Sequence, residues 1–138
     1  MRNTSFATLT AVLFSIASSA HAGPVTSPGP GSSDRKEILD QIRPEAEKQL
    51  GKPVEFVVTT LKVSDGWAFA ILKAQRPGGK PIPASETIFQ PGEIDSHEIF
   101  ALLQDTSSGW LLTEYDLAPT EPSWMAWKQQ YGLPAGLF

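Results

Sequence analysis

Two runs of strand-forming residues meet at a turn near the middle of the chain. Val54–Ala74 is rich in apolar and β-branched residues on either side of Ser64-Asp65-Gly66. An Asp-Gly pair between such runs is typical of a two-residue hairpin turn, because both turn positions need positive φ. The turn predicts three pairs on one face and two on the other: Ser64 with Trp67, Lys62 with Phe69, Thr60 with Ile71, Leu61 with Ala70, and Val63 with Ala68. Since both faces carry apolar residues, we expect one face to be covered and the other partly covered.

The first of these strands changes phase in its middle. Val54, Phe56 and Val58 alternate onto one face, whereas Leu61 and Val63 fall on the other. A bulge near Thr59-Thr60 would bring both halves to the same side.

Residues 34–50 follow a helical pattern. The apolar residues recur at steps of three and four and form one stripe: Ile38, Leu39, Ile42, Ala46 and Leu50. Asp34 is the expected cap, with Glu37 as a capping-box partner, and Gly51 ends the helix. Pro44 predicts either a kink or a break with a restart. The unbroken phase of the stripe favours the kink.

A second hairpin is expected over Glu98–Leu117, with strands at Ile99–Gln104 and Trp110–Leu117. Its expected pairs are Asp105 with Trp110, Leu103 with Leu112, and Phe100 with Tyr115. Between the hairpins, residues 75–92 are rich in Pro and Gly, which predicts a long loop with an edge strand possible at Thr87–Gln90. Long loops are often functional, so this one is the expected binding surface.

A short helix is predicted near the end of the chain, with Thr120 as its cap and Gly132 as its stop. Trp124, Trp127 and Tyr131 share one face of it. Such a stripe can be a stacking platform for a ligand, but it is more often the buried side of a helix, and packing is favoured.

Together these elements predict an α+β fold over residues 34–138: one N-terminal helix packed on a curved antiparallel sheet of two hairpins, followed by a short C-terminal helix. The element order and the Gly-Trp restarts at 66–67 and 109–110 resemble the small rolls of the cystatin-like and nuclear-transport-factor-like families. The ends at Trp124–Trp127 and Pro134–Phe138 also look like those of uncharacterised exported proteobacterial proteins. The resemblance implies a helix lying across the sheet, with either partner-binding loops or a ligand pocket.

The first 22 residues are typical of an export signal. Basic Met1-Arg2 precedes an apolar run from Phe6 to Ala20, and Ala20-His21-Ala22 fits the cleavage pattern. We therefore expect a soluble periplasmic or secreted protein with no membrane insertion after cleavage. Residues 23–33 are mostly Pro, Gly and Ser and predict a flexible linker. No cysteine is present, so a hydrophobic core must provide the stability.

Charge and residue types narrow the function. Removing Arg2 changes the formal net charge from −4 to −5, which argues against nucleic acid as a partner. With no Cys, no Gly-x-Ser-x-Gly motif and His97 as the one histidine after Ala22, nucleophilic catalysis is not expected.

One polar cluster is a candidate site. If residues 93–97 are extended, Glu93, Asp95 and His97 project from one face and could bind a divalent metal. A charged, solvated loop is the favoured alternative. Glu114 and Asp116 are expected on the face of Trp110 and Leu112.

The function that fits best is a non-enzymatic binding module, an inhibitor, immunity or accessory protein, without a cofactor and with another envelope or secreted protein as partner. The alternative is a nuclear-transport-factor-like small-ligand protein or enzyme. It requires a buried acid in an apolar cone lined by Phe56, Phe69, Phe100 and Tyr115. In it, Tyr115 and the aromatic residues of the last helix would contact the ligand.

Overall fold

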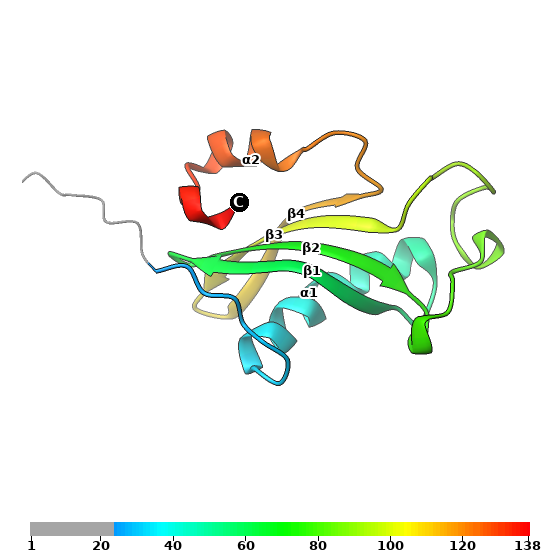
Figure 1. The fold of residues 1–138 in the computed structure, drawn as a ribbon, viewed down its shortest axis with the longest axis horizontal. Coiled ribbons are helices and arrows are strands. Elements are labelled where there is room, and N and C mark those ends of the chain that lie inside the picture. Colours follow the sequence, from blue (N-terminus) through cyan, green and yellow to red (C-terminus); the bar gives the residue numbers. More distant parts are fainter. Residues whose placement is uncertain (1–23) are drawn as a thin grey trace, which may run out of the picture.

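The computed structural model describes residues 24–138, so the expected signal peptide and its cleavage site lie outside the described residues. The two helices and four strands follow the chain as α1 (Ser33–Leu50), β1 (Glu55–Ser64), β2 (Trp67–Gln75), β3 (Glu98–Thr106), β4 (Gly109–Leu117) and α2 (Trp124–Tyr131). The strands form an antiparallel meander in the order β1-β2-β3-β4. α1 lies on one face of the sheet, and α2 with the C-terminal residues lies on the other (Figure 1). The predicted α+β class is confirmed.

The first hairpin has the predicted register. All five expected pairs between β1 and β2 are present, from Ser64 opposite Trp67 to Thr60 opposite Ile71. Asp65 and Gly66 both have positive φ, as this two-residue turn requires. The register shifts between Val58 and Thr60, so the expected bulge is confirmed. Thr59 is its extra residue.

The second hairpin departs from the prediction at one point. Asp105 pairs with Trp110 and Leu103 with Leu112, as expected, but Tyr115 lies opposite Ala101 rather than Phe100. The cause is a second bulge, at Thr113, which shifts the rest of β4 by one residue.

This bulge also corrects the face on which the acids of β4 lie. Glu114 and Asp116 are opposite Leu102 and Phe100, on the side covered by α2. They do not share the face of Trp110 and Leu112.

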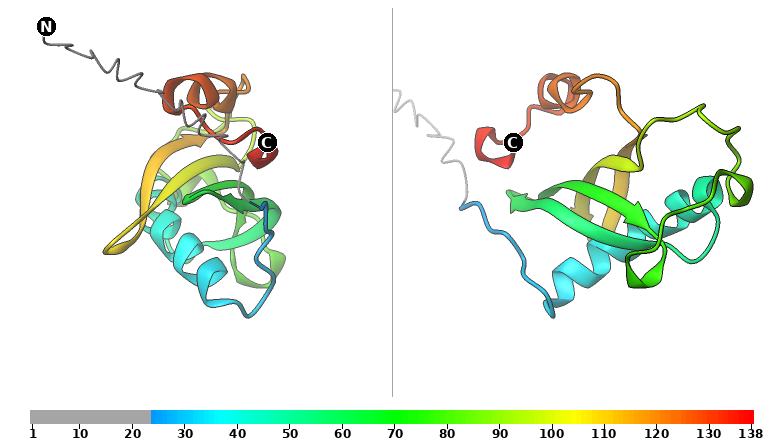
Figure 2. Two further views of the ribbon diagram at one scale, coloured as in Figure 1. Left: turned by 90° about the vertical axis from the view of Figure 1, so that its left-hand side faces the viewer. Right: turned by 45° about the vertical axis from the view of Figure 1, so that its right-hand side comes forward.

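The sheet buries apolar side chains on both faces. On the α1 side, β2 contributes mainly alanines, Ala68, Ala70 and Ala74, whose small side chains let the helix approach closely. On the other side, Phe69, Phe100 and Leu102 pack under Trp127, Leu133 and Leu137. Two views show the twisted sheet between these layers (Figure 2). Both faces of the sheet are therefore covered, whereas the sequence pattern predicted that one of them would be covered only partly.

The ends of α1 are partly as expected. Ser32, not Asp34, is the N-cap, and its hydroxyl accepts a hydrogen bond from the Arg35 N–H at 3.1 Å. The helix continues through Pro44, so the alternative of a break is wrong. Gly51 ends it with positive φ, as predicted.

The segment before α1 contacts both β1 and the C-terminal turn. Thr26 exchanges two backbone hydrogen bonds of 2.8 Å with Val63 of β1. A Cβ on Gly136 would lie 2.6 Å from a methyl group of Val25, so the N-terminal segment also contacts the C-terminal turn. Val25 and Thr26, which belong to the predicted linker of residues 23–33, therefore lie against the rest of the fold.

The C-terminal helix begins later than predicted. Thr120 does not cap it, because Ser123 is the residue at the N-cap position. The Ser123 hydroxyl donates instead to Asp116 of β4 at 2.7 Å and ties the start of α2 to the sheet. Gly132 ends the helix in the left-handed conformation, as expected.

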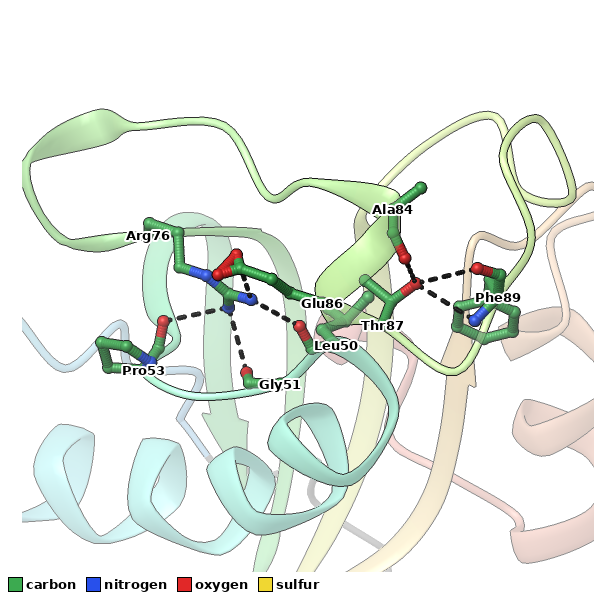
Figure 3. Close-up of polar contacts among 8 residues, drawn as sticks. All are labelled: Leu50, Gly51, Pro53, Arg76, Ala84, Glu86, Thr87 and Phe89. Atoms are coloured by element: carbon green, nitrogen blue, oxygen red, sulfur yellow. Dashed lines mark hydrogen bonds and ion pairs between the residues drawn. The ribbon is translucent and has the colours of Figure 1, made fainter.

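A buried arginine joins the end of α1 to the end of β2. The Arg76 side chain is only 8% exposed, and its guanidinium donates to the carbonyls of Leu50, Gly51 and Pro53 at 2.7–3.1 Å. Glu86 lies 3.7 Å from the same guanidinium (Figure 3). Leu50 is the last residue of α1, and Gly51 and Pro53 follow it, so their carbonyls have no intrahelical donor. Arg76 therefore caps α1 from another element.

Replacing Arg76 tests this cap. Arg76→Met keeps the apolar stem but leaves three carbonyls without their donor, so we expect the free energy of unfolding to fall by about 2–4 kcal/mol. Urea unfolding followed by circular dichroism measures it. Lys73→Met, on the strand that precedes Arg76, is the control, because Lys73 is exposed. Equal stability of the two variants would contradict the role of Arg76.

Candidate functional site

A polar hollow lies where the β1 bulge meets the segment leading into β3. It has a volume of about 430 Å³ and is lined by Thr59, Lys73 and residues 94–98. Two of the three residues in the polar cluster noted in the sequence, Asp95 and His97, are therefore found in one hollow.

His97 is held in this hollow by its backbone. Its carbonyl accepts a hydrogen bond from the Ala74 N–H at 3.0 Å, which fixes the residue beside the end of β2. Partial burial lowers the pKa of the imidazole, and the positive charges of Lys73 and Arg76 lower it further. Because the ordinary value is about 6.5, the ring is neutral at pH 7.

Glu93 is not brought to His97 as a ligand. Residues 91–97 form turns and bends rather than a strand. The Glu93 carboxylate folds back and accepts a hydrogen bond from the Gln90 N–H at 2.7 Å. Within residues 24–138, no three His, Asp or Glu side chains gather closely enough to hold a metal ion. The metal site made of Glu93, Asp95 and His97 is therefore not formed.

The hollow contains hydrogen-bonding groups of both charges. It offers the Lys73 ammonium, the carboxylates of Asp95 and Glu98, and a neutral imidazole. Groups of both charges suit hydrogen bonding to a polar surface.

The aromatic residues of α2 form part of the core. Trp127 is 7% exposed, and the ring of Trp124 stacks on that of Phe138, with centroids 5.1 Å apart. Tyr131 packs against Trp67 and donates a 2.7 Å hydrogen bond to the Glu114 carboxylate. This bond raises the pKa of the Tyr131 phenol. The favoured interpretation of this stripe, packing, is confirmed.

Tyr115 belongs to the opposite face. It packs with the cluster under α1, and its hydroxyl is buried without a hydrogen-bond partner among residues 24–138. Burial, followed by the negative charges of Glu45 and Asp116, raises the pKa of the phenol. The ring is therefore neutral and cannot serve as a base near pH 7.

The apolar cone is not formed as expected. Phe69 and Phe100 lie on the α2 side of the sheet, whereas Phe56 and Tyr115 pack on the α1 side. Because the sheet separates the two pairs, these four side chains do not line one cavity.

The connection between β2 and β3 presents an exposed apolar residue. Ile88 is 66% exposed, yet its N–H donates to the Gln49 carbonyl of α1 at 3.0 Å. The neighbouring Thr87 hydroxyl donates to the Ala84 carbonyl at 2.8 Å and accepts from the Phe89 N–H at 3.1 Å (Figure 3). The predicted edge strand at Thr87–Gln90 is not formed, because residues 87–89 form a bend after the 3₁₀ turn Ala84–Glu86 and are held by these local bonds. The loop is thus fixed to α1 with one apolar side chain directed outward.

The sequence pattern predicted a binding surface in this loop, but it did not indicate Ile88 or Arg76 individually. An isolated isoleucine in a Pro- and Gly-rich segment was the available signal for the first. An arginine directly after an apolar strand was the signal for the second.

Among the described residues, no helix is both long enough and apolar enough to span a membrane.

The packing role of α2 can be tested by truncation. Trp127→Ala removes a buried side chain from the second core, and we expect a loss of about 3–5 kcal/mol in the free energy of unfolding. Met125→Ala on the same helix is the control, because Met125 is 56% exposed. Chemical denaturation measures both. A small effect of Trp127→Ala would show that α2 does not form a core.

The pKa of His97 predicts a stability change with pH. Because the folded-state pKa is below the unfolded value, the unfolded chain binds a proton first as the pH falls through 6.5. Folding stability should therefore decrease between pH 7.5 and pH 5, and His97→Gln should decrease less. Urea midpoints at the two pH values give the comparison. An identical decrease in both proteins would contradict the depressed pKa.

Comparison with known proteins gives no relative from which a role could be transferred. No family model matches the chain, and the searches of curated proteins and of solved structures found no similar protein.

Proposed function

We propose that the protein is a non-enzymatic binding module that presents the connection between β2 and β3, residues 76–97, to a protein partner. The observation that carries this proposal is the fixed position of an exposed apolar side chain, Ile88, on a loop bonded to α1. Scattered exposed apolar residues are common. One held by a hydrogen-bonded loop loses little conformational entropy on binding, which favours recognition.

The surroundings of Ile88 support a protein partner. Glu86 and Glu93 are exposed near it in the sequence. The residues that line the polar hollow at His97 lie at the end of the same connection. An apolar centre with a charged rim is the usual composition of a protein interface. Figure 1 places this loop beyond the end of the sheet, far from the C-terminal turn.

Localisation and fold family are also part of the proposal. The sequence of residues 1–22 supports export to the periplasm or outside the cell, where the partner would be another envelope or secreted protein. One helix across a four-stranded antiparallel meander supports a cystatin-like or nuclear-transport-factor-like roll. The cone required for a small-ligand pocket receives no support, since its residues lie on both faces.

Ile88→Asp tests the proposed surface. Placing a charge at the centre of the interface should reduce recovery of the partner at least about tenfold. The measurement is quantitative mass spectrometry of proteins cross-linked to the purified chain in envelope extract and culture medium. Met125→Asp is the matched control, an exposed apolar residue away from the loop. Proteins recovered equally by both variants, or not at all, would contradict the proposal.

A further inference from the structure

The two edges of the sheet differ in what lies beside them. On the β1 edge, the N-terminal segment is in place, with Thr26 paired to Val63. On the other edge, β4 pairs with β3 and, among residues 24–138, with no other segment. An edge strand presents unpaired N–H and C=O groups to which another strand can bond. β4 is therefore the edge at which an extended segment can be added to the sheet.

The backbone at the end of β4 shows which residues direct these groups outward. The Ala118 N–H donates to the Glu98 carbonyl of β3 at 2.8 Å, so Ala118 faces the sheet. Because the direction alternates along an antiparallel strand, Leu117 and Tyr115 direct their N–H and C=O groups away from β3. Their side chains pack on the α1 side of the sheet and are partly buried. An added strand would bond to these two residues.

The alternating positions, Glu114 and Asp116, give this edge negative charge on the α2 side. Their carboxylates accept 2.7 Å hydrogen bonds from the Tyr131 and Ser123 hydroxyls. A hydroxyl carries no charge, so these bonds do not neutralise the acids. No Lys, Arg or His among residues 24–138 forms an ion pair with either carboxylate. Both side chains are partly exposed. The edge therefore has two adjacent negative charges that no cation compensates.

We propose that the β4 edge binds an extended segment of a protein partner in which two basic residues flank one apolar residue. The segment runs antiparallel to β4. Its basic side chains lie opposite Glu114 and Asp116, and the apolar side chain between them lies opposite Tyr115 on the other face. Backbone bonds give such strand addition its affinity, and the alternate side chains give it specificity. Opposite charges on neighbouring strands stabilise the pairing.

A second copy of this chain does not fit the same edge. Pairing Tyr115 of one copy with Leu117 of another would place the two Asp116 side chains opposite each other, and like charges in this position are destabilising. The chain also contains no two Lys or Arg residues separated by a single residue. None of its own segments therefore has the required pattern, and the segment must come from another protein.

A synthetic peptide tests the site directly. Acetyl-Thr-Val-Lys-Val-Lys-Val-Thr-amide has the proposed pattern. Its addition to isotopically labelled protein should shift the amide NMR signals of Tyr115 and Leu117, with a dissociation constant below about 1 mM. The control peptide, with glutamate in place of both lysines, should bind at least about tenfold more weakly, because like charges then face each other. No shift in β4 at about 1 mM peptide, or equal binding of the two peptides, would overturn the proposal.

Methylation of the peptide backbone separates strand addition from simple charge attraction. In the antiparallel arrangement the central valine directs its N–H toward Tyr115, whereas the lysine N–H groups point away from β4. N-methylation of the central valine should therefore weaken binding at least about tenfold, because it removes a bond and leaves a carbonyl without its donor. N-methylation of one lysine should leave the affinity unchanged. If both methylated peptides bind equally, the segment does not add as a strand and the proposal is wrong.

The role of the two acids is tested in the protein. Glu114→Gln with Asp116→Asn removes both charges, while the amide oxygens can still accept from the Tyr131 and Ser123 hydroxyls. We expect the dissociation constant of the lysine peptide to rise about fivefold.

The matched control, Glu37→Gln with Glu47→Gln, removes two charges from α1 and should change this constant little. An equal rise in both double variants would overturn the proposal, because the overall charge of the protein would then explain it. These results do not depend on whether Ile88 binds a partner.

Discussion

The buried guanidinium of Arg76 is the contact on which the arrangement of the layers depends. A charged group out of water needs several hydrogen-bond partners, and the carbonyls after the last turn of a helix need donors. Arg76 meets both needs at Leu50, Gly51 and Pro53. Gly51 is required there, because a Cβ would lie 2.5 Å from the Glu86 carbonyl oxygen. The end of α1, the end of β2 and the following loop are thereby fixed together.

This connection explains how a loop rich in Pro and Gly is held in one position. Its first residue, Arg76, is anchored to the end of α1. Its middle is bonded to α1 through the Ile88 N–H, and its last residue, His97, is bonded to Ala74 of β2. Prolines restrict the backbone between these points, which reduces the entropy lost when the loop is ordered. The interior of the domain, by contrast, contains packed aromatic and aliphatic side chains on both sides of the sheet.

The features that could be predicted from the sequence are those that neighbouring residues in the chain determine. The Asp65-Gly66 turn sets the register of the first hairpin, and the change of phase at Thr59 made its bulge visible. The bulge at Thr113 could not be seen, because Glu114, Tyr115 and Asp116 give no apolar alternation on either side of it. The predicted metal site of Glu93, Asp95 and His97 is not formed for a related reason. Glu93 is held in a turn by Gln90, and alternation along a strand does not describe a turn.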